Sequence, residues 1–583
     1  MHFKTNSTDP RLRVPLTALS LRCTLVCIEP SHDAKCTLCA IIRLYAYFTN
    51  HSLLNACQRV FINYYGRIVW LWLFEMEILG MDVSVTWVLV TGLITLTAWY
   101  DWWSHHYFQR LGIPVADYIP IFGNLLQWRY GFHQTFADFA KKYGKVFGMY
   151  EFRKPVLIVT DPEIIRKMCI KNFSSFINRK TLPLCQQPRD KGLTRLKGQE
   201  WKEVRNVVMP SFSASKMRLM SPLINGCGDS LVANINKAQT GGKSVDCREI
   251  FGSFAMDASA LCGFGLEVDS QKNKDDPLVE HARKAVDFFL YNPARLICGI
   301  FPILRPIFDY FDFGVFDSKA VDFFTALTND TCKLRRQEGK SASQRIDILQ
   351  LMLNAHGETG DERTNSTKEG ASTRRALTAD EILAQSIIFF FAGYETVSAL
   401  LIFVTYAMAT NPDIQEKLHA EIDDSAPTRD SLNYDVIFKM EYLDKVVSET
   451  LRMYPPGAVF DRFCNETVTY NGLTIEKGVT IMVSVWTIHH NEEYWPNPSK
   501  FDPERFSPEN KESIQPCTYL PFGVGPRNCA GMRYALLVTK MAVLRVMQNF
   551  RFEVSPETQI PLQLGKVGLA PKNLFVRMVP RKK

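Results

Sequence analysis

The segment Phe522-Gly-Val-Gly525-Pro-Arg527-Asn-Cys529-Ala-Gly531 constrains the fold more than any other part of the chain. Its glycines permit backbone dihedrals that a Cβ forbids, so the backbone can approach a flat ligand closely. An arginine offers a planar fork of donors to a carboxylate, and a thiolate on haem iron favours cleavage of a dioxygen bond. A glycine-rich turn with an inert cysteine explains the glycines alone. We therefore predict that Cys529 is the axial ligand of a haem iron.

The segment resembles the haem-binding signature Phe-x-x-Gly-x-Arg-x-Cys-x-Gly of the cytochrome P450 superfamily. Further segments resemble elements of that family in the expected order: Trp201–Arg205, Ala392–Thr396, Glu449–Arg452 and Phe501–Phe506. The resemblance runs from about Met81 to Lys583. It is nearest to the drug- and steroid-oxidising 3A-type microsomal enzymes and to thromboxane-A synthase. It implies a mainly α-helical fold with small β-sheets (α+β), in which one N-terminal transmembrane helix precedes a triangular helical haem domain.

The composition fits a globular protein with a large core and excludes a disordered chain. Of the 583 residues, 46% are hydrophobic and 22% are charged, which is close to ordinary globular usage. The net charge of +8 is modest, and no dense basic run indicates a nucleic-acid partner. The 15 cysteines are scattered, so we expect reduced thiols rather than a disulfide framework. The cysteines nearest the N-terminus do not have a recognised zinc spacing: Cys23, Cys27, Cys36 and Cys39.

An uncharged run of 18 residues from Val83 to Tyr100 predicts a membrane helix, because a span needs about 17–25 apolar residues. Tryptophans and a tyrosine cluster at its two ends, as interfacial aromatics do. A buried core helix is the alternative. Basic residues follow the segment and acidic residues precede it, which puts its C-terminal side in the cytosol. We expect a single-pass anchor at 81–104 in the endoplasmic reticulum membrane, with a cytosolic catalytic domain at 105–583.

Residues 1–80 have no counterpart in the family and no clean periodicity. We expect an extension that is disordered or is an artefact of the gene model, with no role in catalysis. After the anchor, the prolines of Leu111–Asn124 indicate a stiff neck. The apolar stretch Leu296–Phe311 corresponds to the family's channel roof, which dips into lipid; a buried helix and loop is the alternative.

A long central helix is predicted after a polar loop. His356–Arg375 is rich in glycine, serine, threonine and charge, and is expected to be a mobile surface loop. Thr378-Ala-Asp-Glu381 has the capping-box pattern that starts a helix. The helix should run to about Thr410, where Asn411-Pro412 ends it. Because it is apolar on most sides, it should lie in the centre of the protein.

The central helix carries the candidate proton relay. Gly393 leaves space in the helix for oxygen or lets a helical bond open. Glu395 and Thr396 supply an acid and an alcohol suited to proton transfer. The alternative for Thr396 is a hydroxyl bonded back to its own helix turn. Relatives often carry a second threonine where this chain has Val397, which is a mild departure.

Two further sets of residues are expected to build the haem site. Glu449 and Arg452 lie three apart on one helix face, and the resemblance implies that they form a buried structural network with Arg505; a surface ion pair is the alternative. Arginines are expected near the haem propionates, with solvated charges as the alternative: Arg205, Arg462 and Arg527. Trp201 is expected beside Arg205 at one propionate, with a plain core position as its alternative. Pocket-lining positions follow from analogy alone: Arg179, Leu184, Phe391 and Ala458.

The resemblance implies a membrane-anchored haem-thiolate monooxygenase that contains haem b. It inserts one oxygen atom into a hydrophobic small molecule, a steroid, fatty acid, eicosanoid or xenobiotic. Its electrons come from NADPH through NADPH–cytochrome P450 reductase, with cytochrome b5 as a further partner. The runner-up is a thromboxane-A synthase-type isomerase, which rearranges prostaglandin H2 without external electrons. That enzyme typically lacks the threonine at position 396, so Thr396 favours the monooxygenase over both the isomerase and a haem-binding carrier or sensor.

Overall fold

The computed structural model describes residues 75–78, 81–181, 189–273, 276–282, 297–298, 300–310, 318–338, 345–360, 376–565, 570–571 and 573–581. They fall into two compact units that divide between Thr97 and Ala98. The second unit contains all the predicted site residues. It is mainly helical with small β-sheets, which confirms the predicted fold class.

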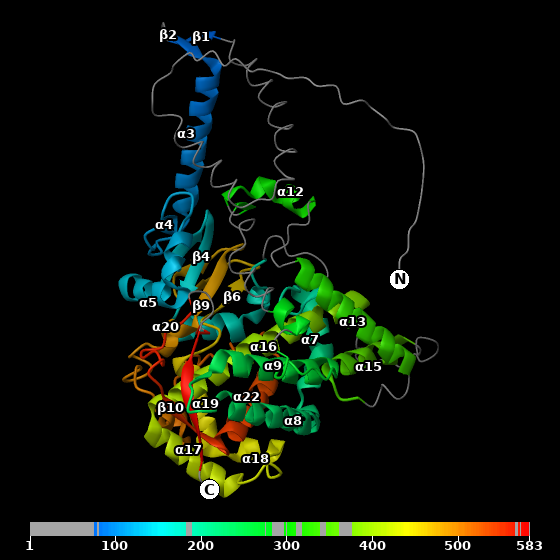
Figure 1. The fold of residues 1–583 in the computed structure, drawn as a ribbon. Helices are drawn as coiled ribbons and strands as arrows, with labels where there is room; N and C mark the ends of the chain where they lie inside the picture. The colour runs from blue at the N-terminus through cyan, green and yellow to red at the C-terminus, as the bar shows by residue number, and fades with distance from the viewer. Residues whose placement is uncertain are drawn as a thin grey trace, which may run out of the picture. The chain divides into compact units, whose positions relative to one another are not determined.

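The helix α16 (Ala379–Thr410) is the centre of the second unit (Figure 1). The Thr378 hydroxyl accepts a hydrogen bond from the Glu381 amide at 3.2 Å, and the Glu381 carboxylate accepts one from the Thr378 amide at 2.8 Å. This capping box confirms the predicted start, and the helix ends one residue before Asn411 as expected. Among the described helices, α16 alone has the length and hydropathy of a membrane span, but 61% of its most apolar window is buried. It is therefore a core helix.

Other helices pack around α16 and short 3-10 turns connect them. α9 (Cys247–Phe264) makes the most extensive contact with α16, and α8 (Ala214–Ala238), α19 (Glu441–Met453) and α22 (Met532–Met547) complete the core. The other helices in the described part of this unit are α4 (Tyr107–Arg110), α5 (Phe132–Tyr143), α6 (Pro162–Arg166), α7 (Gly198–Val208), α12 (Arg305–Tyr310), α13 (Ser318–Glu338), α15 (Ile348–Gly360), α17 (Pro412–Ser425), α18 (Tyr434–Lys439), α20 (Val485–His489) and α21 (Pro508–Lys511).

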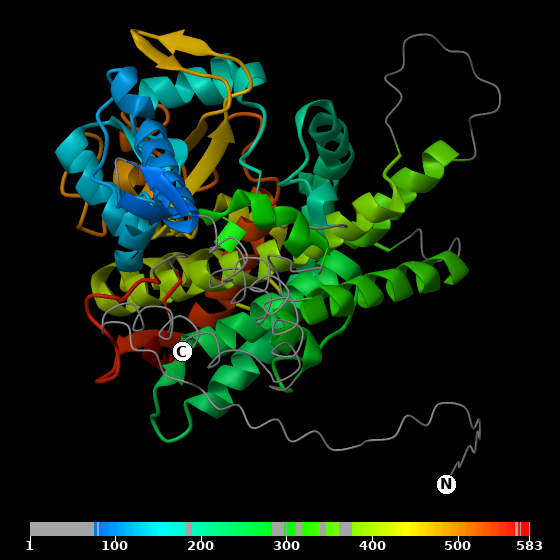
Figure 2. The same ribbon diagram turned by 90° about the horizontal axis from the view of Figure 1, so that it is seen from above.

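The largest sheet has the strand order β3-β4-β9-β6: Val146–Glu151, Lys154–Val159, Thr480–Ser484 and Val459–Phe463. Only β4 and β9 run parallel, with Val156 opposite Thr480. Figure 2 shows the sheet to one side of the core helices. The second sheet has the order β10-β11-β5 (Phe550–Val554, Phe575–Pro580, Val245–Asp246), and β7 (Val468–Tyr470) pairs with β8 (Leu473–Ile475).

The helix α3 (Val85–His105) covers the predicted anchor. The strands β1 (Glu75–Ile78) and β2 (Met81–Ser84) form a hairpin before it, so the helix begins at Val85 rather than at Met81. Six of its large apolar side chains are 59% to 66% exposed: Trp87, Leu89, Leu93, Ile94, Leu96 and Trp99. Threonines and tryptophans keep its mean hydropathy below that of α16. The predictions for residues 1–74, including their cysteines, lie outside the described residues.

The last turn of α3 belongs to the second unit, and two of its titratable side chains are buried there. Asp101 and His105 are 6% and 0% exposed. The Asp101 carboxylate accepts hydrogen bonds from the Ile121 amide at 3.1 Å and from Arg153 Nε at 3.2 Å. His105 Nδ1 lies 2.8 Å from the Asp101 carbonyl oxygen, and Nε2 lies 3.1 Å from that of Phe152. The predicted neck thus packs against the turn between β3 and β4.

Of two other predicted segments, only the first differs from the leading expectation. α15 continues to Gly360, so the first residues of the expected polar loop are helical; residues 361–375 lie outside the described part. In the stretch Leu296–Phe311, four apolar side chains are 52% to 84% exposed: Phe301, Ile303, Ile307 and Tyr310. The buried alternative is therefore wrong for these four residues.

Candidate active site

The cysteine loop is held by its own backbone just before α22. The Cys529 amide donates to the Phe522 carbonyl at 2.8 Å, and the Asn528 amide donates to the Gly525 carbonyl at 3.0 Å. Gly525 has a φ of 77°, and a Cβ there would lie 1.9 Å from the Cys169 carbonyl oxygen. Only glycine fits this position. Gly531 has more room, because its nearest foreign neighbour would be a Phe212 ring atom at 3.9 Å.

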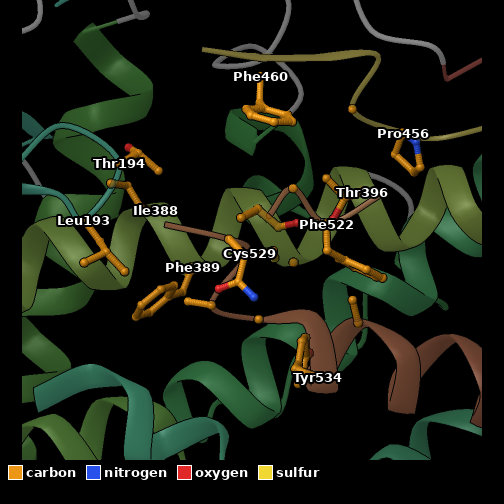
Figure 3. A pocket seen from close by; sticks show the side chains of 18 of the residues that line it. Leu193, Thr194, Ile388, Phe389, Thr396, Pro456, Phe460, Phe522, Cys529 and Tyr534 are labelled. Atoms are coloured by element: carbon orange, nitrogen blue, oxygen red, sulfur yellow. Dashed lines mark hydrogen bonds between the residues drawn. The ribbon is translucent and has the colours of Figure 1, made fainter. Parts of the chain in front are cut away.

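Cys529 faces a cavity of about 400 Å³ (Figure 3). Cys529 keeps accessible surface and is part of the cavity wall. Burial raises the pKa of the thiol, while a hydrogen bond from the Gly531 amide and the charges of Arg179 and Arg205 lower it. A bound cation would therefore be needed to hold the thiolate firmly.

The cavity wall is mostly apolar and comes from several elements. Figure 3 shows Phe389 and Thr396 on α16, Tyr534 on α22 and Cys529 on the loop before α22. The polar side chains Thr194, Ser259 and Thr396 are also part of the wall. Aromatic and aliphatic residues supply much of the rest: Phe212, Ile348, Ile388, Val397, Leu400, Pro456, Val459, Phe460, Leu520 and Phe522.

The structure separates the two residues of the predicted relay. Thr396 lines the cavity and donates its hydroxyl proton to the Ala392 carbonyl oxygen at 2.5 Å, which is the back-bonded alternative. Glu395 does not line this cavity; its carboxylate lies 3.7 Å from Arg248 Nη2. A Cβ at Gly393 would lie 2.7 Å from Ser259 Oγ of α9. The glycine therefore permits close packing of α9 on α16.

Four arginines line one part of the cavity: Arg179, Arg205, Arg462 and Arg527. Arg462 and Arg527 are 1% and 2% exposed. Burial and the neighbouring guanidinium groups of Arg179, Arg462 and Arg205 lower the pKa of Arg527 to about 9, although Asp461 opposes this effect. Within the described part of the chain, the Nε atoms of Arg179 and Arg527 are buried without a hydrogen-bond partner. Among the groups that shift this pKa, Asp461 is the one carboxylate against three arginines, so cationic charge is in excess.

Trp201 lies between two of these cations. Its ring centroid is 4.6 Å from Arg527 Cζ and 5.5 Å from Arg205 Cζ, and its side chain is buried. Arg205 donates to the side-chain and backbone oxygens of Asn528 at 2.7 and 3.1 Å. Arg205 thus holds the residue before Cys529 by two hydrogen bonds. The sequence predicts Arg205 only near a propionate and does not indicate this contact.

The structure brings Glu449, Arg452 and Arg505 together. Glu449 and Arg452 are 0% exposed, and two parallel bonds of 2.7 and 2.8 Å join their charged groups. Arg505 Nε lies 3.4 Å from the same carboxylate, which also accepts the Asp502 amide at 3.0 Å. The surface alternative for the Glu449–Arg452 pair is wrong, because the pair lies fully inside the protein.

These features fit haem b. The cavity joins an apolar wall for a flat ring, a thiol for iron and a cationic cluster for two propionates. When bound through Cys529, haem iron would supply the binding and cleavage of dioxygen. The arginines with unpaired buried Nε atoms are the donors that a carboxylate would complete.

Sequence reasoning identified the cysteine loop, the arginines and Thr396 but missed much of the rest of this wall. Arg179 was expected only as a pocket residue, yet it belongs to the cationic cluster. Phe212, Ser259 and Tyr534 come from segments without a motif, so no local signal marks them. Phe391 and Ala458 do not line this cavity, and Leu184 lies outside the described residues.

The comparisons with known proteins agree with this geometry. The family model Cytochrome P450 matches residues 113–578. Cytochrome P450 3A9 of Rattus norvegicus is 40% identical over 499 residues, which cover 85% of this chain and 97% of the relative. Lithocholate 6-beta-hydroxylase of Mesocricetus auratus is 40% identical over 511 residues, covering 87% and 99%. The family model covers most of the chain and these relatives are 40% identical to it, so the chain belongs to the cytochrome P450 family of haem monooxygenases.

Proposed function

We propose that the protein inserts one oxygen atom from dioxygen into a hydrophobic small molecule, with electrons from NADPH. The presence of Thr396 in the wall of the cavity that Cys529 enters carries this proposal. An endoperoxide isomerase needs no proton delivery at this position. The apolar wall favours an uncharged or largely apolar substrate such as a steroid, a fatty acid or eicosanoid, or a xenobiotic.

Thr396 is proposed to deliver protons through its hydroxyl. In this structure the hydroxyl proton is donated to the Ala392 carbonyl oxygen, so it is not free to be transferred. Rotation about χ1 would release this bond and turn the hydroxyl toward a water in the cavity. Glu395 is proposed to act at the solvent side of the relay, because its carboxylate is 30% exposed and pairs with Arg248 outside the cavity wall.

One incubation series tests the reaction type. The purified holoenzyme is given prostaglandin H2 without NADPH or reductase, and is separately given a panel of apolar substrates with both. Lithocholate is a natural first member of the panel, given the name of one relative. Product that requires NADPH, reductase and dioxygen together supports the monooxygenase. Efficient thromboxane formation without them overturns it in favour of the isomerase.

Replacing Thr396 tests the relay itself. Thr396→Val keeps the shape of the side chain but removes the hydroxyl, and we expect product formation to fall by about 10²-fold. NADPH consumption should fall much less, because electron delivery does not pass through this residue. Thr405→Val is the matched control, since Thr405 is buried in the same helix and does not line the cavity. An unchanged yield of product per NADPH in Thr396→Val contradicts the role, whereas Cys529→Ala should abolish activity under either reaction type.

We further propose that α3 is a single membrane span in the endoplasmic reticulum, with the catalytic domain in the cytosol. Its exposed apolar side chains support this, as do the basic residues after it and the acidic residues before it. NADPH–cytochrome P450 reductase and cytochrome b5 are the proposed electron donors. A chain that starts at Met81 should remain in membranes after alkaline washing and keep its activity. Release of that chain into the soluble fraction overturns the anchor.

A further inference from the structure

His489 lies between the buried ion-pair network and the cysteine loop. It is the last residue of α20 and is 0% exposed. Its ring stacks on Tyr519 at 5.6 Å between centroids, and the centroid of Trp495 lies 6.4 Å away in a T-shaped arrangement. His489 does not line the cavity, so it does not contact substrate or cofactor.

Both ring nitrogens of His489 are bonded, and the partners fix the tautomer. The Leu520 amide donates to Nε2 at 2.8 Å. An amide nitrogen can only donate, so Nε2 must carry the lone pair. Nδ1 therefore carries the proton, which it donates to the Arg452 carbonyl oxygen at 3.0 Å. Burial, with the nearby His490 and Arg452, lowers the pKa of His489, which agrees with this neutral form.

The contact with Arg452 is reciprocal. Arg452 Nη1 donates to the His489 carbonyl oxygen at 2.9 Å, while the His489 ring donates to the Arg452 carbonyl oxygen. Arg452 is itself held by two bonds to Glu449. The imidazole thus has a fixed orientation before it meets the loop.

Leu520 is where the cysteine loop begins. Its carbonyl oxygen accepts the Gly523 amide at 3.0 Å, and the Phe522 carbonyl oxygen then accepts the Cys529 amide at 2.8 Å. Leu520 also lines the cavity. A displacement of the Leu520 amide would therefore move the turn that positions the Cys529 thiol.

We propose that His489 is a positioning residue that transmits the rigidity of the Glu449–Arg452 pair to the cysteine loop by accepting the Leu520 hydrogen bond. Its removal would leave a buried amide without an acceptor and loosen the loop. The ligand that this loop holds is the haem of the proposed site.

Two substitutions separate the two bonds of the ring. In His489→Gln, the side-chain carbonyl reaches the position of Nε2 and accepts from the Leu520 amide. In His489→Asn, the amide group stands near Nδ1, so it keeps the donor to Arg452 but leaves Leu520 unpaired. His490→Asn is the control, because His490 bonds to the Trp486 carbonyl oxygen at 2.9 Å and stacks on that residue's ring.

The measurements are haem release from the holoenzyme to excess apomyoglobin, the thiolate-type spectrum of the ferrous carbon-monoxide complex, and hydrogen exchange of the peptide that contains Leu520. We expect His489→Asn to release haem about tenfold faster, with a smaller thiolate-type fraction and faster exchange. His489→Gln should stay within about threefold of the natural protein, and His490→Asn should match it.

Equal effects of His489→Asn and His489→Gln on haem release overturn the proposal, as does the absence of any effect. If His489→Asn does not fold, the Leu520 exchange in His489→Gln decides the matter. Protection equal to that of the natural protein supports the acceptor role. Faster exchange in a normally folded His489→Gln overturns it. Because none of these readouts depends on turnover, they are independent of which reaction the enzyme performs.

Discussion

Two arginine clusters serve the cysteine loop, and they differ in how their charge is neutralised. Arg452 and Arg505 share the Glu449 carboxylate, which also accepts a backbone amide. Arg179, Arg205, Arg462 and Arg527 instead gather around the cavity. Burial lowers the pKa values of Arg205, Arg462 and Arg527, and the charge of Arg179 lowers them further. The first cluster has its anion within the protein, whereas the second has cationic groups in excess.

The difference shows what each cluster is for. A buried charge that the protein itself neutralises is part of the scaffold, and removing one partner strands the other. A buried cationic cluster that the protein leaves short of anions marks the place of an anionic ligand. The comparison can therefore be tested by removing the anion of either cluster: the Glu449 carboxylate from the protein, or the two propionates from the haem.

The largest effect is expected from the scaffold cluster. Glu449→Ala leaves Arg452 and Arg505 without their anion, which costs about 3–5 kcal/mol. We expect little folded protein and no haem incorporation, measured by urea unfolding and by the haem spectrum. Glu441→Ala, on the exposed first turn of the same helix, should behave like the natural protein. Normal expression of Glu449→Ala with a full haem spectrum would show that the network is dispensable.

The ligand cluster is tested by changing the ligand instead of the protein. Haem dimethyl ester keeps the iron and the flat ring but lacks both carboxylates. We expect the apoprotein to bind it about 100-fold more weakly than haem, which corresponds to about 2.7 kcal/mol. Titration of the apoprotein followed by absorbance measures both affinities. In Arg527→Met the difference between the two ligands should shrink, and equal affinities in the natural protein would remove the propionate role of the cluster.

A smaller effect is expected from Arg205, which contacts the loop through Asn528. Arg205→Gln should cost about 1–2 kcal/mol, because hydrogen bonds from a charged donor are lost. Faster haem release to apomyoglobin is the measurement. Arg218→Gln is the matched control, since Arg218 forms an exposed pair with Asp435 and such pairs contribute little. Similar release rates in both variants would place Arg205 among ordinary surface charges.

The smallest effect concerns pH. In the haem-free protein the pKa of Arg527 is lowered to about 9, first by burial and then by the arginines around it. Above this folded-state pKa, the folded protein has lost the Arg527 proton while the unfolded chain still binds it. The free energy of unfolding therefore rises with pH. Relative to Arg527→Met, the natural apoprotein should gain about 1 kcal/mol between about pH 8 and about pH 10. Thermal unfolding of both forms measures this gain, and a flat difference contradicts it.

The sequence predicted what depends on short spacing. The glycine-rich loop, the Thr378 capping box and the spacing of Glu449 and Arg452 are local patterns, and the structure contains each of them. The relay pair shows the limit of this reasoning. Neighbouring residues on a helix point about 100° apart, so Thr396 faces the cavity while Glu395 faces Arg248. The motif predicted both residues as one relay and did not indicate that their side chains point in different directions.

Contacts between distant segments could not be predicted. His489 meets Arg452 across 37 positions and Leu520 across 31, and one histidine in an apolar segment has no pattern that marks such partners. The cluster of Arg179 likewise combines residues that are far apart in the sequence, from β6 and the cysteine loop. Tertiary packing decides these contacts, and spacing along the chain does not record it.

The buried charges at the end of α3 bear on how a soluble form of the enzyme should be cut. Asp101 satisfies the Ile121 amide and Arg153, and His105 is fully enclosed. A truncation after His105 would remove these groups and leave Arg153 without its carboxylate. A truncation before Asp101 would discard most of the exposed apolar surface of α3 and keep the charges in place. The division between the two compact units likewise lies inside α3, between Thr97 and Ala98, about two turns before the helix ends.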